Sequence, residues 1–304
     1  MISKFVGSLR AYRALGVVAA SAFVLAMPVG NARAEMIFGV TEQNILISWD
    51  SASPGSVMSG VAITGLNQNE DIQSIDFRPG TGQLYGIGSQ GNLFTINTAT
   101  GQATAVNGGS NNPLNPGLNG SNFGMDFNPT VDLIRITSNA DQNMRVNPDT
   151  GAVVASDSLL AYANGDSNFG VNPNVTHSAY TNNFAGAQST TLYGIDAGLD
   201  VLVVQNPANS GLLTTVGPLG LNVAEDGGFD ISGLSGAAYA VLRPTNSSVS
   251  FFYSINLISG QATLIGEIGG GVNIRAMSIV PIPGPSALLV TAFGVVLFRP
   301  RRRT

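Results

Sequence analysis

A short phrase that the chain repeats constrains its fold more than any other feature. Each copy has an Asp between apolar residues, then a turn, then a strand-like run. The copies read IDFRPGTGQLYGIG at 75–88, MDFNPTVDLIRITS at 125–138 and FDISGLSGAAYAVL at 229–242, and they align without a gap. A looser fourth copy begins at Ala179 and has a longer turn. Repetition at roughly 50-residue intervals indicates one supersecondary unit used several times, as in a solenoid or a propeller.

Each copy continues with two more strand-like runs, so the repeated unit has four. After the phrase at 75–88 come residues 93–96 and 103–106, with a turn at Thr100-Gly101 between them. Gly and Asn are frequent between the runs, and both tolerate the positive φ of tight turns. No window between the two ends of the chain has a sustained helical period of apolar residues. Four short antiparallel strands per unit are typical of a propeller blade.

The two ends of the repeat region predict how the ring closes. Residues 37–66 match strands two to four of the unit and lack strand one, whereas residues 276–279 match strand one alone. A last strand that joins the first three would leave neither edge unpaired. We therefore predict an all-β propeller over residues 35–280, with five four-stranded blades closed by the C-terminal strand. One further degenerate copy would make six blades.

Acidic residues dominate this region. All 18 Asp and Glu residues but only five of the 13 Lys and Arg residues lie within 35–280, so the region carries a formal charge of −13. A surface this acidic repels phosphate backbones, and we expect no nucleic-acid partner. The chain has no Cys, and its length is sufficient for a core without disulfide bonds.

Residues 1–34 have the pattern of a secretory signal peptide. A basic stretch precedes an apolar run at 14–29, and Ala32-Arg33-Ala34 is an A-x-A cleavage site before Glu35. We therefore expect cleavage between Ala34 and Glu35 and an exported mature chain. An uncleaved membrane anchor is the alternative, but the apolar run is short and the cleavage site has small residues.

Residues 281–304 combine a Pro-rich joint, a short apolar segment and a terminal Arg cluster. The apolar segment, 286–298, would rise about 20 Å as a helix, less than the roughly 30 Å hydrocarbon core of a bilayer. The Arg cluster should stay on the cytoplasmic side. We expect this transmembrane segment to hold the exported domain at the inner membrane, at least for a time.

This tail resembles the PEP-CTERM class of bacterial sorting signals, which have a Pro-x-Pro motif, a short membrane segment and a basic end. In this chain the motif is Pro281-Ile282-Pro283, with Ile where the commonest form has Glu, closer to the Val-Pro-Leu-Pro-Ala variant. The resemblance implies a Gram-negative bacterium that produces exopolysaccharide. It also implies an exosortase, a membrane protease-transpeptidase that cuts near the motif and sends the domain to the cell surface or extracellular matrix.

The repeat region resembles a bacterial family. The phrases SIDFRPGTGQLYGIGS, GMDFNPTVDLIRITSNADQNMRVNPDTGAVVA and TTLYGIDAGLDVLVVQNP are similar to those of domain of unknown function 4394 (DUF4394). The resemblance covers about residues 37–280. It implies a β-propeller-like fold and an extracytoplasmic setting, and it brings no known activity and no catalytic residues.

Three Asp residues occupy the same position in strand one of their copies: Asp76, Asp126 and Asp230. Ala179 and Ser278 occupy this position in the other copies. Strand one is the innermost strand of a blade, so these carboxylates could line the channel and bind a cation such as Ca²⁺. The alternative is that each carboxylate hydrogen-bonds backbone groups of the following turn.

Two Arg residues of the third blade, Arg135 and Arg145, interrupt the repeat on adjacent strands. A guanidinium group can bind a ligand or pair with a carboxylate of the protein. The nearest candidates for such pairing are Asp132, Asp141 and Asp149. Structural pairing and a ligand site both remain open at this stage.

Two long connections, 107–122 and 156–176, border the same blade. Each joins strand four of one blade to strand one of the next, so both emerge on one face. Long loops often carry binding residues, and the second connection contains amide, carboxylate and aromatic side chains that suit sugar hydroxyls and ring faces. These candidates are Tyr162, Asp166, Asn168 and Phe169. A solvated loop without a ligand is the alternative.

No local motif predicts catalysis, and we expect His177, the single His, to be structural. We predict a secreted, membrane-tethered or surface-associated binding or matrix module, associated with an extracellular polysaccharide. One alternative is a calcium-assisted extracellular hydrolase or lyase of a carbohydrate or lactone, and another is a purely structural surface protein. An enzyme should have Asp, Asn or His residues converging on a cation at the channel mouth, whereas a binding module should have a broad polar or aromatic surface.

Overall fold

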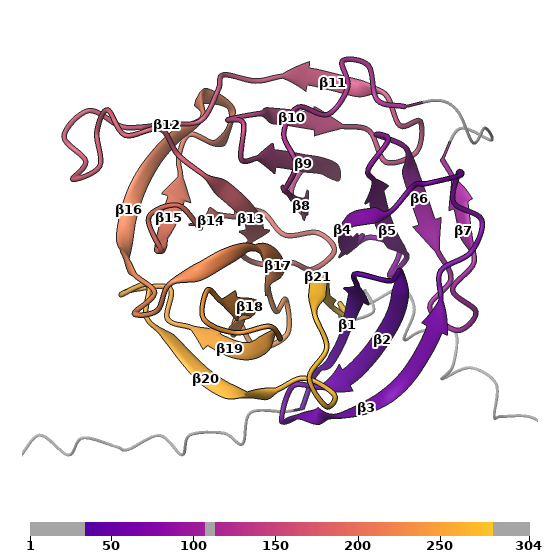
Figure 1. Ribbon diagram of the computed structural model, residues 1–304. Helices are drawn as coiled ribbons and strands as arrows, with labels where there is room; N and C mark the ends of the chain where they lie inside the picture. Colours follow the sequence, from indigo (N-terminus) through magenta and orange to yellow (C-terminus); the bar gives the residue numbers. More distant parts are fainter. Residues whose placement is uncertain (1–33, 107–112, 282–304) are drawn as a thin grey trace, which may run out of the picture. The chain divides into compact units, whose positions relative to one another are not determined.

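Five β-sheets surround a common centre, and their strands follow one another outwards from it (Figure 1). The computed structural model describes residues 34–106 and 113–281. Predictions for residues 1–33, 107–112 and 282–304 therefore lie outside the described residues. The prediction of an all-β propeller with five blades is confirmed.

Each blade has four antiparallel strands that follow one another outwards from the centre, and the first strand named for each blade is the innermost. Blade 1 consists of β21 (Ile274–Ile279), β1 (Met36–Thr41), β2 (Ile45–Asp50) and β3 (Ser53–Ala62). Blade 2 consists of β4 (Ile72–Phe77), β5 (Leu84–Gly88), β6 (Leu93–Ile96) and β7 (Ala103–Ala105). Blade 3 consists of β8 (Phe123–Asn128), β9 (Leu133–Ser138), β10 (Asn143–Val146) and β11 (Val153–Ser156). Blade 4 consists of β13 (Val175–Tyr180), β14 (Leu192–Asp196), β15 (Val201–Gln205) and β16 (Leu212–Pro218). Blade 5 consists of β17 (Val223–Ile231), β18 (Ala238–Pro244), β19 (Phe251–Ile255) and β20 (Ala262–Glu267).

The last strand of the chain closes the ring, as the unmatched ends of the repeat region predict. β21 pairs antiparallel with β1, and Ser278 stands opposite Phe38 in this register. β21 also packs against the innermost strands of the two neighbouring blades, β4 and β17. Blade 1 therefore joins both ends of the repeat region and leaves no innermost strand without neighbours.

Blade 4 differs from the predicted four strands because it has a fifth at its outer edge. β12 (Ala161–Tyr162) belongs to the connection 156–176 and pairs parallel with β16. The sequence pattern predicts a loop throughout this connection, because two residues are too few to show an alternating pattern. One short 3₁₀ helix, η1 (Ala208–Ser210), precedes β16.

The outer hairpins of blades 2, 3 and 5 share one turn. In blade 2, Asn97 Oδ1 accepts hydrogen bonds from the N–H groups of Ala99 and Thr100, and Gly101 follows with φ +73°. Asn147 and Asn256 start equivalent turns in the other two blades. The Asn side chain replaces a backbone acceptor, and Gly adopts the left-handed conformation without a Cβ clash.

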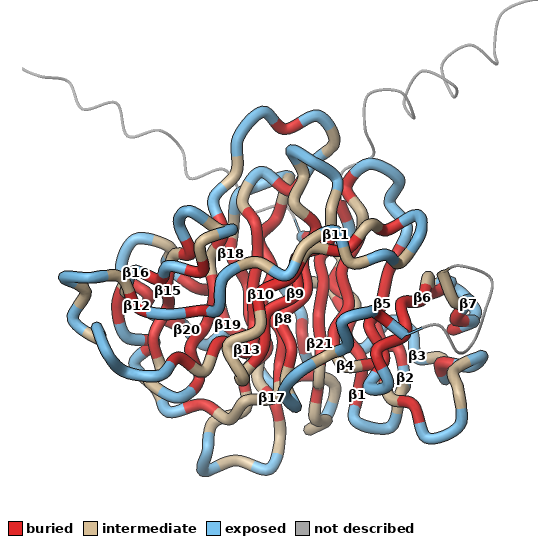
Figure 2. Tube along the Cα trace, turned by 90° about the horizontal axis from the view of Figure 1, so that it is seen from above, coloured by how far each residue is buried: buried red, intermediate tan, exposed pale blue. Residues whose placement is uncertain are grey.

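Apolar side chains of neighbouring blades pack against each other and form the core. Edge-to-face aromatic pairs cross three of the boundaries. The ring centroids are 5.7 Å apart for Phe38 and Phe77, 5.8 Å for Trp49 and Phe252, and 5.2 Å for Tyr85 and Phe127. The innermost strands are largely buried, whereas the connections are exposed (Figure 2). This arrangement fixes the inner strands rigidly and leaves the loops available for contacts with other molecules.

Candidate functional site

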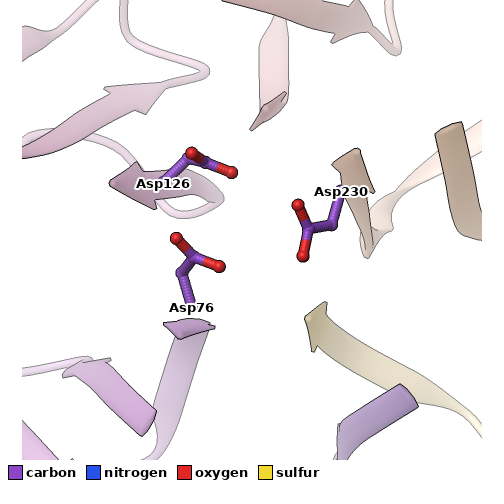
Figure 3. Close-up of side chains that lie close together, drawn as sticks. All are labelled: Asp76, Asp126 and Asp230. Carbon is purple, nitrogen blue, oxygen red and sulfur yellow. The ribbon is translucent and has the colours of Figure 1, made fainter. Parts of the chain in front are cut away.

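The three repeated carboxylates meet at the centre of the ring. Asp76 lies on β4, Asp126 on β8 and Asp230 on β17, and each is 1% exposed. One carboxylate oxygen of each lies within 4.8 Å of the others, and the side chains point towards a common centre (Figure 3). The structure thus brings together the residues that the sequence analysis proposed as cation ligands.

These carboxylates hydrogen-bond to the backbone of neighbouring blades. Asp76 Oδ2 accepts the N–H of Phe127 on β8 at 2.8 Å, and Asp230 Oδ2 accepts the N–H of Ile279 on β21 at 2.7 Å. Asp76 and Asp230 also each accept the N–H of the next residue of their own strand. The alternative to cation binding was that each carboxylate bonds backbone groups of the following turn. In the structure the carboxylates of Asp76 and Asp230 instead bond N–H groups of neighbouring inner strands, and these bonds join the blades.

Ser278 completes this arrangement at the seam of the ring. Its Oγ lies 2.7 Å from Asp76 Oδ1 and 3.1 Å from Asp230 Oδ2, and it accepts the N–H of Phe77 at 3.1 Å. A serine at the Asp position of the closing strand therefore links the strands on both sides of it without adding a fourth negative charge.

The environment of the three carboxylates favours their neutral form. Burial raises the pKa of Asp76 and Asp126, and the negative charge of the neighbouring Asp residues raises them further. Burial also raises the pKa of Asp230 to about 6, against the opposing effect of its backbone hydrogen bonds. Desolvation and like-charge repulsion thus outweigh the N–H donors at this cluster.

A small cavity lies where the inner strands begin. Its volume is about 90 Å³, and its lining includes His177, Asp226 and Arg275. Burial lowers the pKa of His177 to about 4, so the imidazole is neutral at pH 7. Asp226 pairs with Arg243 at 2.5 Å. A cavity of this size holds a few waters or an ion, whereas pockets for organic ligands usually measure about 300–1,000 Å³.

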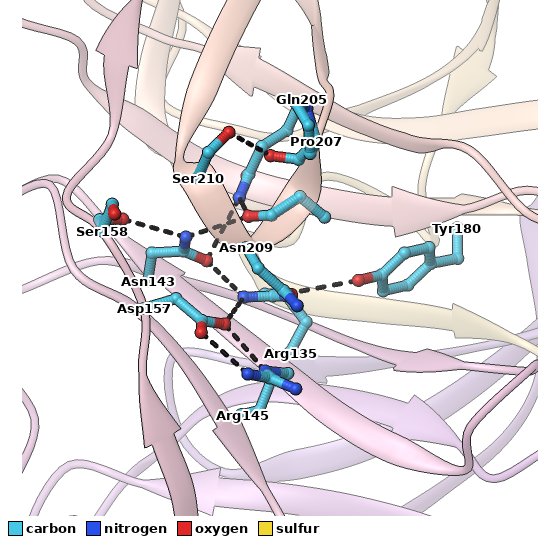
Figure 4. A network of polar contacts seen from close by, with 11 residues as sticks. Arg135, Asn143, Arg145, Asp157, Ser158, Tyr180, Gln205, Pro207, Asn209 and Ser210 are labelled. Atoms are coloured by element: carbon cyan, nitrogen blue, oxygen red, sulfur yellow. Dashed lines mark hydrogen bonds and ion pairs between the residues drawn. The ribbon is translucent and has the colours of Figure 1, made fainter.

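Arg135 is at the centre of a buried polar network (Figure 4). Its side chain is 1% exposed, and its guanidinium donates to Asn143 Oδ1, Asp157 Oδ2 and Asn209 Oδ1, each at 2.6 Å. Tyr180 Oη is a fourth acceptor at 3.3 Å. These acceptors occupy all three guanidinium nitrogens, so the geometry favours a supporting role over contact with a ligand.

Arg145 shares the Asp157 carboxylate with Arg135 (Figure 4). Burial alone would raise the pKa of Asp157, but hydrogen bonds from both guanidinium groups lower it below its ordinary value. The predicted partners were wrong: Asp132 and Asp149 pair with Arg78, and neither bonds to Arg135 or Arg145. Asp157 was overlooked because it lies beyond β11, in the connection 156–176.

The polar candidates in the connection 156–176 attach it to blade 4. Asp166 accepts hydrogen bonds from the N–H and the hydroxyl of Thr215 at 2.7 and 2.8 Å, and Asn168 donates to the same hydroxyl at 2.9 Å. Tyr162 is buried and donates to Asp196 Oδ2 at 2.6 Å. Of the four candidates in this connection, Phe169 is the one that presents most of its side chain to solvent, with 61% exposed.

A groove of about 270 Å³ runs along this connection. Its floor includes Tyr162, and its wall is the segment 169–173. Asn172 hydrogen-bonds Asp141 in the turn between β9 and β10. The connection 113–122 contacts the same turn, because the carbonyl oxygen of Gly117 accepts a hydrogen bond from Gln142. Both connections therefore border the same turn, as expected for one face.

A second, larger groove of about 540 Å³ lies on blade 2. Thr, Asn and Gln side chains of β6, β7 and the turn between them form most of its lining. The sequence pattern does not predict this groove. Thr95 and Thr104 alternate with more buried residues, but the same alternation is typical of any pair of strands that faces solvent.

Together these features define a class: a five-bladed β-propeller whose innermost strands are joined by buried carboxylates, with grooves on its loops and outer strands. The chain belongs to the family Domain of unknown function (DUF4394), whose model matches residues 45–278. The resemblance seen in the sequence is thereby confirmed. No curated protein matches the chain.

The chain is similar to several solved structures at low sequence identity. Hydrazine synthase from Kuenenia stuttgartiensis is 12% identical with a TM-score of 0.39, covering 72% of this chain and 53% of its own. A protein of unknown function from Bacteroides thetaiotaomicron is 13% identical with a TM-score of 0.46, covering 81% and 66%. Dihydro-heme d1 dehydrogenase NirN, in complex with DHE, is 9% identical with a TM-score of 0.36, covering 75% and 43%. The chain thus spans between 43% and 66% of these structures' lengths.

The predictions for the two ends of the chain fall mostly outside the described residues. Within residues 34–106 and 113–281, no helix is long and apolar enough to cross a membrane. Glu35, the first residue after the predicted cleavage site, is buried, and its backbone N–H donates to Ser51 Oγ at 2.9 Å.

Proposed function

We propose that the protein is an extracellular binding module that holds a polysaccharide in the groove along the connection 156–176. The observation that carries this proposal is a firmly attached loop with apolar side chains directed to solvent. Phe169 is 61% exposed and Val171 is 44% exposed. Asp166 and Asn168, which precede Phe169 in the chain, are hydrogen-bonded to Thr215 and hold the loop in place. A loop fixed in this way loses little conformational entropy when it binds.

The composition of the groove suits a sugar chain. An aromatic ring and aliphatic side chains offer apolar surface to the faces of sugar rings, and the neighbouring Asn172 offers its amide oxygen as an acceptor for hydroxyl groups. The domain has a formal charge of −13 over residues 35–280. A strongly acidic surface repels polyanions, so the preferred ligand is a neutral polysaccharide.

The alternative of a calcium-assisted hydrolase or lyase has less support. Its catalytic carboxylates would have to be Asp76, Asp126 and Asp230, and each of these is 1% exposed. A substrate cannot reach groups that are buried to this extent while the inner strands stay in place. The cavity at the start of the inner strands, at about 90 Å³, is also too small for a sugar unit of a polymer.

Export and tethering belong to the same proposal. We infer from the sequence that a signal peptide directs residues 35 onwards out of the cytoplasm and that the tail from Pro281 holds the precursor at the inner membrane until an exosortase cuts it. The binding module would then reach the cell surface or the surrounding matrix, where exopolysaccharide is available as its ligand.

An array of neutral and acidic oligosaccharides, probed with the labelled full-length chain, tests this function. We expect retention on neutral sugars and a loss of most of the signal in Phe169→Ala. Ile258→Ala is the matched control, because Ile258 is 90% exposed on the turn between β19 and β20 of another blade. Absence of any retained sugar, or equal losses in both variants, would contradict the proposal.

A further inference from the structure

Three carboxylates lie together at the centre of the ring. Asp76, Asp126 and Asp230 come from three different blades, and one oxygen of each lies within 4.8 Å of the others. None of the ion pairs among the residues that the structure describes includes any of the three. Burying ionised carboxylates together is costly unless a positive charge compensates them.

Two buried oxygen atoms beside this cluster have no hydrogen-bond partner. One is Asp126 Oδ1, on a side chain that is directed towards Asp76 and Asp230 (Figure 3). The other is Oδ1 of Asn183, whose side chain is 3% exposed and hydrogen-bonds Asp230. Buried polar atoms are nearly always bonded, so an unpartnered carboxylate oxygen within the cluster and an unpartnered amide oxygen on a neighbour of Asp230 indicate a ligand at the cluster.

We propose that Asp76, Asp126 and Asp230 bind one Ca²⁺ ion, with the Asn183 amide oxygen as a further ligand. A set of oxygen donors alone suits a hard cation. Ca²⁺ accepts about six to eight oxygen ligands in irregular geometry, whereas Mg²⁺ requires near-octahedral geometry and usually keeps several waters. A buried set of carboxylate and amide oxygens therefore favours Ca²⁺.

The hydrogen bonds of the cluster would orient its ligands. The N–H of Phe127 holds the Asp76 carboxylate, and the N–H of Ile279 holds that of Asp230. The ion would thus connect blades 2, 3 and 5 at the centre of the ring, where these bonds already join blade 2 to blade 3 and blade 5 to blade 1. Because the ligands are buried, the ion should enter during folding and exchange slowly afterwards.

This site is independent of the proposed polysaccharide groove, and refolding tests it directly. The full-length chain is unfolded in urea with a chelator and refolded with either CaCl₂ or EGTA. After desalting, bound metal is measured by mass spectrometry and the melting temperature by circular dichroism. We expect one Ca²⁺ per chain and a melting temperature about 5–10 °C higher than in EGTA.

Asp126→Asn separates cation binding from folding. The amide oxygen can still accept the Tyr180 N–H, and the amide NH₂ can donate to the other carboxylates, so this variant should melt in EGTA at or above the parent's temperature. This variant should retain no Ca²⁺, and its melting temperature should be the same after refolding in CaCl₂ and in EGTA. Glu267→Gln, on the outer strand β20, should behave as the parent does. A refolded parent without Ca²⁺, or an Asp126→Asn variant that retains it, would overturn the assignment.

Discussion

The carboxylate of Asp76 accepts a 2.8 Å hydrogen bond from the backbone N–H of Phe127, which lies on the neighbouring blade. Asp230 makes the same kind of bond to Ile279 across another blade boundary. The repeated Asp thus joins inner strands that share no sheet, and it does so at the centre of the ring. This role explains why the residue recurs, whether or not a cation binds it.

Replacing Asp76 by Ala should lower the free energy of unfolding by about 2–4 kcal/mol. The change leaves the buried N–H of Phe127 without an acceptor, which costs about 1–3 kcal/mol, and it also removes the bonds of Asp76 to Phe77 and Ser278. Urea denaturation of the parent and the variant measures the difference. Glu267→Ala, on an exposed position of β20, should change stability by less than about 0.5 kcal/mol. Similar stability in the two variants would rule out the blade-joining role.

Arg135 and Arg145 should differ sharply when each is replaced by Ala. Arg135 is 1% exposed and has four acceptors, so its loss should cost about 3–5 kcal/mol. The Arg145 side chain is 27% exposed and its Asp157 partner retains Arg135, so its loss should cost about 1 kcal/mol or less. Urea denaturation measures both values. Neither substitution should change the affinity for sugar. If a stably folded Arg145→Ala variant binds sugar more weakly than the parent, Arg145 contacts the ligand after all.

The buried His177 makes stability depend on pH. Its pKa is lowered to about 4 in the folded protein, whereas the unfolded chain has the ordinary value of 6.5. Between these values the unfolded chain binds a proton that the folded protein does not, so the stability of the parent falls as pH drops from about 6.5 to about 4, by at most about 1.4 kcal/mol per pH unit. His177→Gln should lack this contribution.

The difference between parent and variant separates the effect of His177 on the pH dependence of stability from that of the central carboxylates. Their pKa values are raised, so their effect on stability has the opposite sign: it is present at low pH and lost as pH rises through about 6 for Asp230. The excess stability of the parent over His177→Gln should decrease from pH 7 to pH 4.5 in urea titrations. A constant excess would mean that folding does not lower the pKa of the imidazole.

Removal of residues 274–280 should open the ring. This deletion takes away β21, which pairs with β1, and with it Ser278, which bonds Asp76 and Asp230. Blade 1 then exposes the inner edge of β1, and two neighbouring inner strands lose their packing partner. Thermal unfolding followed by circular dichroism should show a large drop in melting temperature or no cooperative transition. An unchanged melting temperature would refute closure by the last strand.

The repeated phrase predicted the number of blades, the closing strand and the convergence of three Asp residues, because all of these follow from period and strand order. It could not predict the bond from Phe127 to Asp76, since a backbone donor leaves no trace in residue type. Asp157 was missed as the partner of Arg135 for a related reason. The two are 22 residues apart, and only the course of the chain after β11 brings them together.

The connection 156–176 shows the same limit. Its composition indicated a loop with binding residues, but Asp166, Asn168 and Tyr162 are bonded to blade 4 and leave Phe169 as the exposed candidate. Polar side chains in a loop fasten the loop or bind a ligand, and sequence pattern alone does not distinguish the two. The distinction required the position of Thr215, which lies on another strand.

The dissociation constant of Phe169→Ala for the oligosaccharide that the parent binds best, measured by titration calorimetry, tests the proposed function most directly. Loss of the exposed ring should weaken binding about tenfold or more, which corresponds to about 1.4 kcal/mol, while melting stays within about 1 °C of the parent. Ile258→Ala should bind within about twofold of the parent. A Phe169→Ala variant that binds as tightly as the parent would contradict the assignment of this groove as the binding site.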